Sequence, residues 1–126
     1  MREKLSTIQK RENLNAVLVV DEKGNDGANH KYLIMGRGPF ADGENRPVYG
    51  VIDFQNGPRK LEDSKYGVLD TDLLEIVRHR IQCFQKGKLA ADANAHALKH
   101  IEEALMWMNR RIEDRIERGV LGTDNK

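Results

Sequence analysis

Residues 94–123, NAHALKHIEEALMWMNRRIEDRIERGVLGT, contain the pattern that decides the fold. Apolar side chains recur in this stretch at spacings of three and four, as in a helix that buries one face against another helix. The members of this apolar stripe are Leu98, Ile101, Leu105, Met108 and Ile112, and it extends to Asn94 and Ile116. We therefore predict one long helix that begins near residues 92–94 and ends before Gly119.

A second stripe lies roughly a quarter turn away on the same helix and carries three arginines. These are Arg111, Arg115 and Arg118. Guanidinium groups on one stripe repel one another unless anions lie among them. Neighbouring carboxylates of the helix can supply these anions, or the arginines can form a phosphate clamp, because a guanidinium fork matches phosphate oxygens. The residues alone leave both interpretations open.

Residues 71–86 repeat the helical period and predict a shorter helix before the long one. Its apolar face comprises Leu73, Leu74, Val77, Ile81 and Phe84. Thr71 or Asp72 is expected to cap its start, and Gly87 to end it in the left-handed conformation. Two amphipathic helices on a short link form a helical hairpin. Phe84, in the last turn, is either a core residue or an exposed plate on which a base can stack.

The first half of the chain predicts a small antiparallel sheet. A β-branched run at 16–22 is followed by turn residues and by a second apolar run at 31–36, and a third follows at 48–55. Pro58 has no N–H to donate, so residues 59–62 are at most an edge strand.

The predicted fold class is therefore α+β, with a small N-terminal antiparallel sheet followed by a two-helix hairpin with a long C-terminal helix. We expect a flexible arm at 1–13 and a single domain at 14–126, in which the sheet spans about 15–68 and the hairpin about 71–118, before a short tail.

Composition and residue spacing argue against several classes of function. The 126-residue chain has a net charge of +1, from 21 basic and 20 acidic residues, and so lacks the basic field of proteins that bind nucleic acid polymers. No apolar run approaches the roughly 20 residues of a membrane span, and we expect a soluble intracellular protein. A single cysteine, Cys83, is expected to be a packed thiol. His96 and His100 lie one turn apart without a recognisable third ligand, so no metal site and no catalytic set is predicted.

Three segments together resemble a phage family. They are FQNGP at 54–58, DLLEIV with RI and FQ within 72–85, and the stretch at 94–123. In this order they are similar to the Thoeris anti-defense protein one family, whose helical hairpin is shared with the anti-CBASS protein two. Members of the family are described as sponges that sequester cyclic ADP-ribose isomers made by bacterial TIR proteins, without cleaving them. Some also hold cyclic oligonucleotides at separate sites.

The resemblance implies a ligand site without metal, cofactor or catalytic residue, in a protein that acts in the cytoplasm of an infected bacterium. It implies that Phe84 stacks on the adenine, that Asn94 is a polar contact, and that Arg111 and Arg115 bind the phosphates of a 1″-2′ or 1″-3′ glyco-cyclic ADP-ribose. Arg59, after the Gly-Pro turn, is a further candidate.

Helix geometry adds that one chain cannot complete such a site. Asn94 and Arg111 are about 26 Å apart along one helix at 1.5 Å per residue, which is too far for one compact dinucleotide. A second chain running antiparallel would bring its arginines beside the first chain's Phe84, so we expect a homodimer or larger homo-oligomer with sites shared between protomers. The alternatives are a hairpin protein that docks on a host protein and binds no nucleotide, and a protein that mainly sequesters cyclic oligonucleotides.

Overall fold

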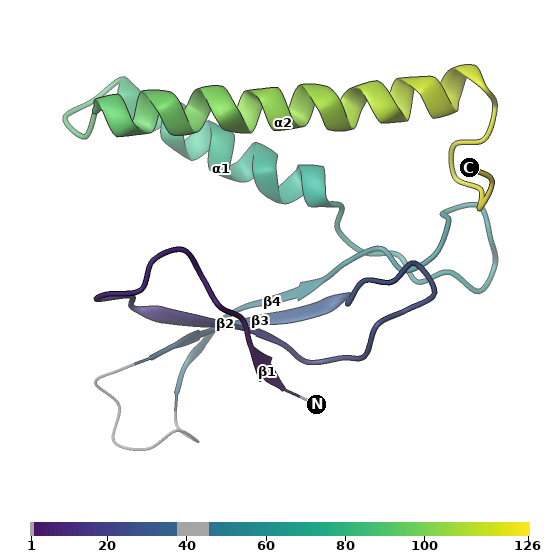
Figure 1. The fold of residues 1–126 in the computed structure, drawn as a ribbon, viewed down its shortest axis with the longest axis horizontal. Helices are drawn as coiled ribbons and strands as arrows, with labels where there is room; N and C mark the ends of the chain where they lie inside the picture. Colours follow the sequence, from purple (N-terminus) through teal and green to yellow (C-terminus); the bar gives the residue numbers. More distant parts are fainter. Residues whose placement is uncertain (1, 38–45) are drawn as a thin grey trace. The chain divides into compact units, whose positions relative to one another are not determined.

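The computed structural model describes residues 2–37 and 46–126, and the chain divides into two compact units. The units are Met1–Gly57 with Lys65–Gly67, and Pro58–Ser64 with Val68–Lys126. The first contains the sheet and the second the two helices (Figure 1), which confirms the predicted α+β class. That residues 14–126 form a single domain stays a prediction.

The first unit is a four-stranded antiparallel sheet in which the strands follow one another in chain order. The strands are β1 (Glu3–Lys4), β2 (Asn15–Val19), β3 (Lys31–Gly36) and β4 (Val48–Asp53). In the register of the sheet, Leu33 of β3 faces Leu18 on one side and Val51 on the other. The buried apolar side chains are Ala16, Val19, Leu33 and Met35. The core of the described residues therefore lies on β2 and β3, the two runs with the clearest strand composition.

The segment predicted as a flexible arm contains β1. Glu3 faces Val19 and Lys4 faces Leu18, and the Leu5 N–H donates to the Val17 carbonyl over 2.9 Å. This pairing ties the start of the segment to β2, while mobility of its remainder stays a prediction.

Residues 59–62, for which the sequence allowed at most an edge strand, form turns. The Leu61 N–H and the Ser64 hydroxyl both donate to the Pro58 carbonyl, over 3.0 and 2.6 Å. Asn56 instead pairs with Lys65 through two backbone hydrogen bonds of 2.9 and 2.8 Å. A proline that fixes its own backbone angle and cannot donate favours the turn over the strand.

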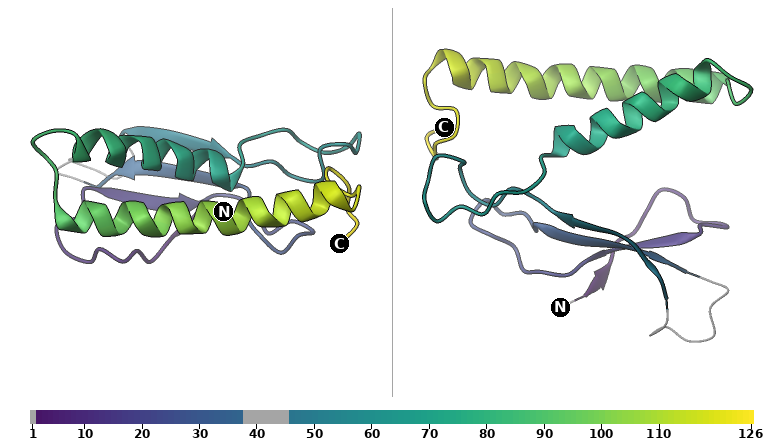
Figure 2. Two further views of the ribbon diagram at one scale, coloured as in Figure 1. Left: turned by 90° about the horizontal axis from the view of Figure 1, so that it is seen from above. Right: turned by 180° about the vertical axis from the view of Figure 1, so that it is seen from behind.

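The second unit contains the predicted helical hairpin, formed by α1 (Asp70–Gln85) and α2 (Asp92–Glu117). The helices are closest at their short link and diverge toward the N-terminus of α1 (Figure 2). Across the hairpin, Arg78 donates from Nε to Glu102 over 2.8 Å, and it also bonds Glu75 of its own helix at 3.2 Å. A helix pair of this kind can bury one face of each member.

The predicted ends of α1 were correct to one residue, but the predicted caps were wrong. Leu69 is the N-cap residue, so Asp72 stands at the third helical position and accepts the Leu69 N–H over 2.8 Å. Lys86 ends the helix in the right-handed region, and Gly87 does not adopt the left-handed one. The left-handed stop occurs instead after α2, at Gly119 with φ of 72°.

The apolar stripe of α2 is only partly covered. Leu98, Ile101, Leu105, Met108 and Ile112 are half-buried, while 49% of Ile116 is exposed. The 16 residues of α1 span about 24 Å and the 26 residues of α2 about 39 Å, so α1 cannot reach the end of the stripe. Among the residues of the two helices, only Arg115 is buried.

Candidate ligand-binding site

α2 runs without interruption from Asp92 to Glu117. Asn94 in its first turn and Arg111 near its other end are therefore about 26 Å apart along the axis, as the sequence predicted. The predicted site residues accordingly divide into two groups, one at each end of this helix.

The first group lies where the two helices meet. Phe84, in the last turn of α1, is half-buried, and the guanidinium carbon of Arg80 lies 5.4 Å from the centre of its ring. A cation over one face of the ring leaves base stacking to the opposite face. Asn94 donates from Nδ2 to the Leu89 carbonyl over 3.1 Å, and its side-chain oxygen accepts no hydrogen bond from the described residues. This group can offer a ligand an aromatic plate and an amide acceptor.

Gln85 fixes the link that joins these two residues. Its Nε2 donates to the Ala91 carbonyl over 3.1 Å, and its Oε1 accepts the Ala91 N–H over 2.9 Å. Both hydrogen-bonding groups of one amide are thus used to close the link between α1 and α2.

The second group lies at the C-terminal end of α2, where the arginines of one stripe differ sharply. Arg111 is exposed and forms no hydrogen bond or ion pair within the described part of the chain. Arg118 bonds the carboxylate of Asp114 at 3.0 Å. Arg115 is only 8% exposed, and its guanidinium donates to three backbone carbonyls of the segment that follows the helix. The expected neutralisation by carboxylates therefore occurs for Arg118, but Arg115 has carbonyl partners instead.

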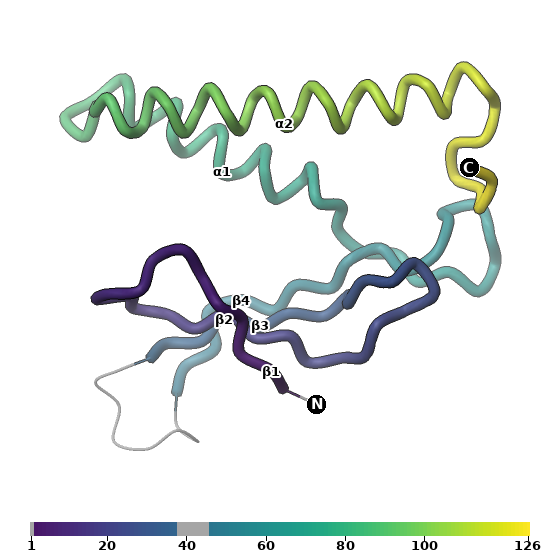
Figure 3. The backbone as a smooth tube through the Cα atoms, viewed as in Figure 1, coloured from purple at the N-terminus to yellow at the C-terminus, as the bar shows by residue number. Residues whose placement is uncertain are grey.

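Arg59 belongs to this second group because its loop bonds the C-terminal tail, residues 119–126. The Lys60 N–H donates to the Gly122 carbonyl over 3.0 Å, and the tail turns back to this loop in Figure 3. Arg59 and Lys60 line a groove of about 360 Å³ between the loop and the tail. Its other lining residues are Ile116, Gly119, Leu121 and Gly122. The groove thus combines two cations with an apolar floor, and the sequence analysis did not identify Lys60.

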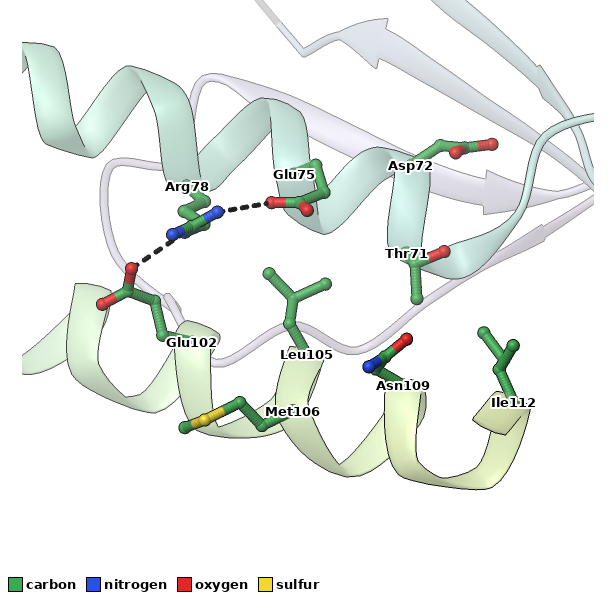
Figure 4. Close-up of a pocket in the computed structure, with 9 residues that line it drawn as sticks. All are labelled: Thr71, Asp72, Glu75, Arg78, Glu102, Leu105, Met106, Asn109 and Ile112. Carbon is green, nitrogen blue, oxygen red and sulfur yellow. Dashed lines mark hydrogen bonds and ion pairs between the residues drawn. The ribbon is translucent and has the colours of Figure 1, made fainter. Parts of the chain in front are cut away.

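A larger groove of about 640 Å³ lies between the diverging parts of α1 and α2 (Figure 4). Asp72, Glu75 and Glu102 line it together with one cation, Arg78, and it contains none of the predicted ligand residues. Hydrogen bonds to Glu102 and then to Glu75 raise the pKa of Arg78, so its charge is committed to these carboxylates. The excess of carboxylates disfavours a phosphate ligand. Sequence periodicity could not predict this groove, because it depends on the angle between the helices.

The remaining reactive side chains of the described residues form no second candidate site. Cys83 is exposed, so the expected packing of its thiol was wrong, and its Sγ lies 3.8 Å from Nε2 of His79. Within residues 2–37 and 46–126, no three histidine, cysteine or carboxylate side chains are grouped to hold a metal ion. The same residues contain no helix that is both long and apolar enough to cross a membrane.

The amino-acid sequence is similar to those of known proteins. The family model described as Acb2/Tad1, hairpin domain, matches residues 47–113, which include β4, α1 and most of α2. The Thoeris anti-defense 1 protein of Bacillus phage SBSphiJ7 is 43% identical over 76 residues, covering 60% of this chain and 53% of the phage protein. The chain thus spans about half the length of this curated relative. Since the family model covers more than half of the chain, the chain belongs to the Acb2/Tad1 hairpin-domain family.

Proposed function

We propose that the protein sequesters a cyclic ADP-ribose isomer and thereby blocks Thoeris immunity in the cytoplasm of an infected bacterium. The observation that carries this proposal is the separation of two groups of side chains along α2. Phe84 of α1 and Asn94 lie where the two helices meet, and Arg111 lies near the other end of α2, where the loop that carries Arg59 bonds the C-terminal tail. A cyclic dinucleotide of this class needs both, because it presents a base, ribose hydroxyls and a diphosphate. The similarity to the Thoeris anti-defense 1 protein of the Bacillus phage supports the anti-defense role.

The two ends act on one ligand only if they come from two protomers. An antiparallel partner would bring its cationic end to the Phe84 end of the first chain, giving two equivalent sites. Exposed apolar side chains support such an assembly, since Ile76 is 58%, Met106 63% and Trp107 68% exposed. A homodimer would remove some of this surface from water.

Binding is stoichiometric in this proposal, with no reaction step. The ring of Phe84 stacks on the base, the Asn94 side chain reads the ribose linkage, and the guanidinium of Arg111 binds the diphosphate. To outcompete the host receptor, the protein needs nanomolar affinity, which corresponds to about 12 kcal/mol of binding free energy.

Release of intact ligand after denaturation tests this function. The purified protein is incubated with the 1″-2′ and 1″-3′ glyco-cyclic ADP-ribose isomers, washed, and heated, and the supernatant is assayed by mass spectrometry. We expect intact ligand in the supernatant only after heating. Degraded ligand would indicate an enzyme, and a wash that contains all of the ligand would contradict sequestration.

Two neighbouring arginines make a matched pair for the same assay. Arg111→Ala is expected to weaken binding about tenfold or more, because a charged hydrogen bond to phosphate is lost. Arg110→Ala removes an equal charge from the preceding residue. The guanidinium of Arg110 lies 5.4 Å from the Trp107 ring centre, and this variant is expected to bind the ligand normally. Equal losses in both variants would show only a general effect of charge.

Two further ligand classes serve as comparison arms. If the protein retains cyclic oligonucleotides in place of the ADP-ribose isomers, sequestration stands and only the identity of the ligand changes. The exposed Met106 and Trp107 also suit a docking surface for a host protein. A protein that retains none of these nucleotides, but still blocks Thoeris signalling in cells, would favour that second function.

A further inference from the structure

Arg115 is an unusual member of the arginine stripe because its guanidinium is buried against neutral partners. Nη1 donates to the Asn125 carbonyl over 2.8 Å, and Nη2 donates to the carbonyls of Val120 and Thr123, both over 3.0 Å. No carboxylate of the described residues forms an ion pair with it. A buried cation needs such hydrogen bonds to remain inside, so the C-terminal tail is folded around this side chain.

The folded tail in turn holds the loop that contains Lys60. Gly122 accepts the Lys60 N–H through its carbonyl, and its φ of 80° is a conformation that favours glycine. A Cβ added at Gly122 would lie 2.9 Å from Cγ, 3.2 Å from Cδ and 3.3 Å from Cε of Lys60. The stem of Lys60 therefore lies directly over Gly122, and a path of contacts runs from Arg115 through the tail to Lys60.

Lys60 ends this path in a groove suited to an anion. Its ammonium group forms no ion pair with any residue in the described ranges, and no carboxylate is among the residues that line the groove. Ile116 and Leu121, which are 49% and 38% exposed, supply apolar surface beside the two cations. An anion with a planar or apolar portion, such as a nucleotide diphosphate, matches this combination.

We propose that Lys60 is a further anion-binding residue and that Arg115 positions it through the C-terminal tail. Arg115 then contributes to binding without being a phosphate ligand itself. The identity of the anion rests on the proposed function, whereas the link from Arg115 to Lys60 does not. The family model ends at residue 113, so the positioning tail lies outside the matched region.

The path of contacts from Arg115 to Lys60 is tested without any ligand. Amide hydrogen exchange is measured by mass spectrometry in the wild type, in Arg115→Met and, as a matched control, in Arg111→Met. We expect peptides from 58–64 and 119–125 to exchange on the order of tenfold faster in Arg115→Met and to be unchanged in Arg111→Met. Unchanged exchange of the 58–64 peptide in a folded Arg115→Met would overturn the positioning role.

If Arg115→Met fails to fold, a second variant tests the same path of contacts. Gly122→Ala leaves Arg115 in place but forces a Cβ against the stem of Lys60. It is expected to accelerate exchange in the 58–64 peptide by a similar factor. Normal exchange in this variant would show that the tail does not hold the loop.

Anion binding is tested by a double-mutant cycle with two probes, a glyco-cyclic ADP-ribose isomer and inorganic pyrophosphate. Lys60→Met and Arg115→Met are each expected to weaken binding about tenfold, and the double variant about tenfold rather than a hundredfold, because both act through one ammonium group. A hundredfold loss would mean that Arg115 contacts the anion independently, and full affinity in Lys60→Met would remove Lys60 from the site. A further outcome is that the wild type binds pyrophosphate but not the isomer. If Lys60→Met then loses pyrophosphate binding, Lys60 binds an anion in this groove but the proposed function is refuted.

Discussion

The loop between β2 and β3 contains a carboxylate whose ionisation should make the stability of the sheet depend on pH. Asp26 accepts the Ala28 N–H over 3.0 Å and lies 2.9 Å from Nε2 of His30. The Ala28 donor, followed by the His30 side chain, lowers the pKa of Asp26 below its ordinary value. A carboxylate with a depressed pKa stabilises the folded state above its unfolded pKa, and this contribution is lost as the pH falls through the folded pKa.

We therefore predict that the urea midpoint of the sheet falls as the pH is lowered from about 6 to about 2.5, and falls less in Asp26→Asn. Near-ultraviolet circular dichroism can follow this unfolding through the Tyr32 ring, which lies edge-on to Phe54 at 5.6 Å. The amide that this substitution introduces can still accept the Ala28 N–H, so the variant removes the charge and keeps the turn. A pH dependence identical to that of the wild type would refute the role of this carboxylate.

Arg111 and Arg115 show what the pattern of single residues could and could not predict. They lie one turn apart on the same stripe, and helix geometry alone placed them there. Their environments differ because the chain after Glu117 folds back over Arg115, using left-handed glycines at 119 and 122. The period of a helix does not encode such a return, so the two guanidinium groups could not be distinguished from the sequence.

The link between α1 and α2 depends on one side chain, which gives a prediction at the scale of the hairpin. Gln85 forms two hydrogen bonds with the backbone of Ala91. Gln85→Ala removes both and is expected to lower the free energy of unfolding of the hairpin by about 1 kcal/mol, since exposed hydrogen bonds stabilise modestly. Thermal unfolding followed by far-ultraviolet circular dichroism measures this loss.

Gln82→Ala is the matched control for that substitution. Gln82 lies one turn earlier on α1 and forms no hydrogen bond within the described chain. Both substitutions replace glutamine with a better helix former, so propensity contributes equally to each. Equal unfolding temperatures for the two variants would mean that the contacts with Ala91 add nothing.

The elements and their approximate bounds were largely predictable, and the capping residues were not. A spacing of three and four and β-branched runs determine where a helix or strand is stable, and the observed bounds follow them closely. The caps depend on which polar atom reaches which backbone N–H. Asp72 accepts the Leu69 N–H from inside the helix, whereas the sequence analysis placed Thr71 or Asp72 itself at the N-cap.

At the scale of the whole molecule, the order of sheet and hairpin followed from the periodicity of the sequence and its turn residues. The separation of Asn94 and Arg111 along α2 followed from helix geometry. The loop at 58–64 was the main departure. Its turns carry Arg59 and Lys60 to the C-terminal tail through the Lys60–Gly122 hydrogen bond. Contacts between segments about 60 residues apart leave no local pattern, so the groove they form could not be predicted.

Sharing of the site between protomers can be tested by mixing two variants that each weaken binding. Phe84→Ala loses the aromatic end of both sites in a homodimer, and Arg111→Ala loses the cationic end of both. In a mixed dimer, one site combines both defects, whereas the other contains the wild-type Phe84 of one protomer and the wild-type Arg111 of the other. After unfolding and refolding together, an equimolar mixture should form about half of its dimers as mixed ones and recover about a quarter of the wild-type ligand capacity. Competition calorimetry against a weaker ligand gives this capacity as the number of sites that keep the wild-type affinity, and each variant refolded alone is the control. If the two residues act within one protomer, every site retains a defect and mixing restores nothing.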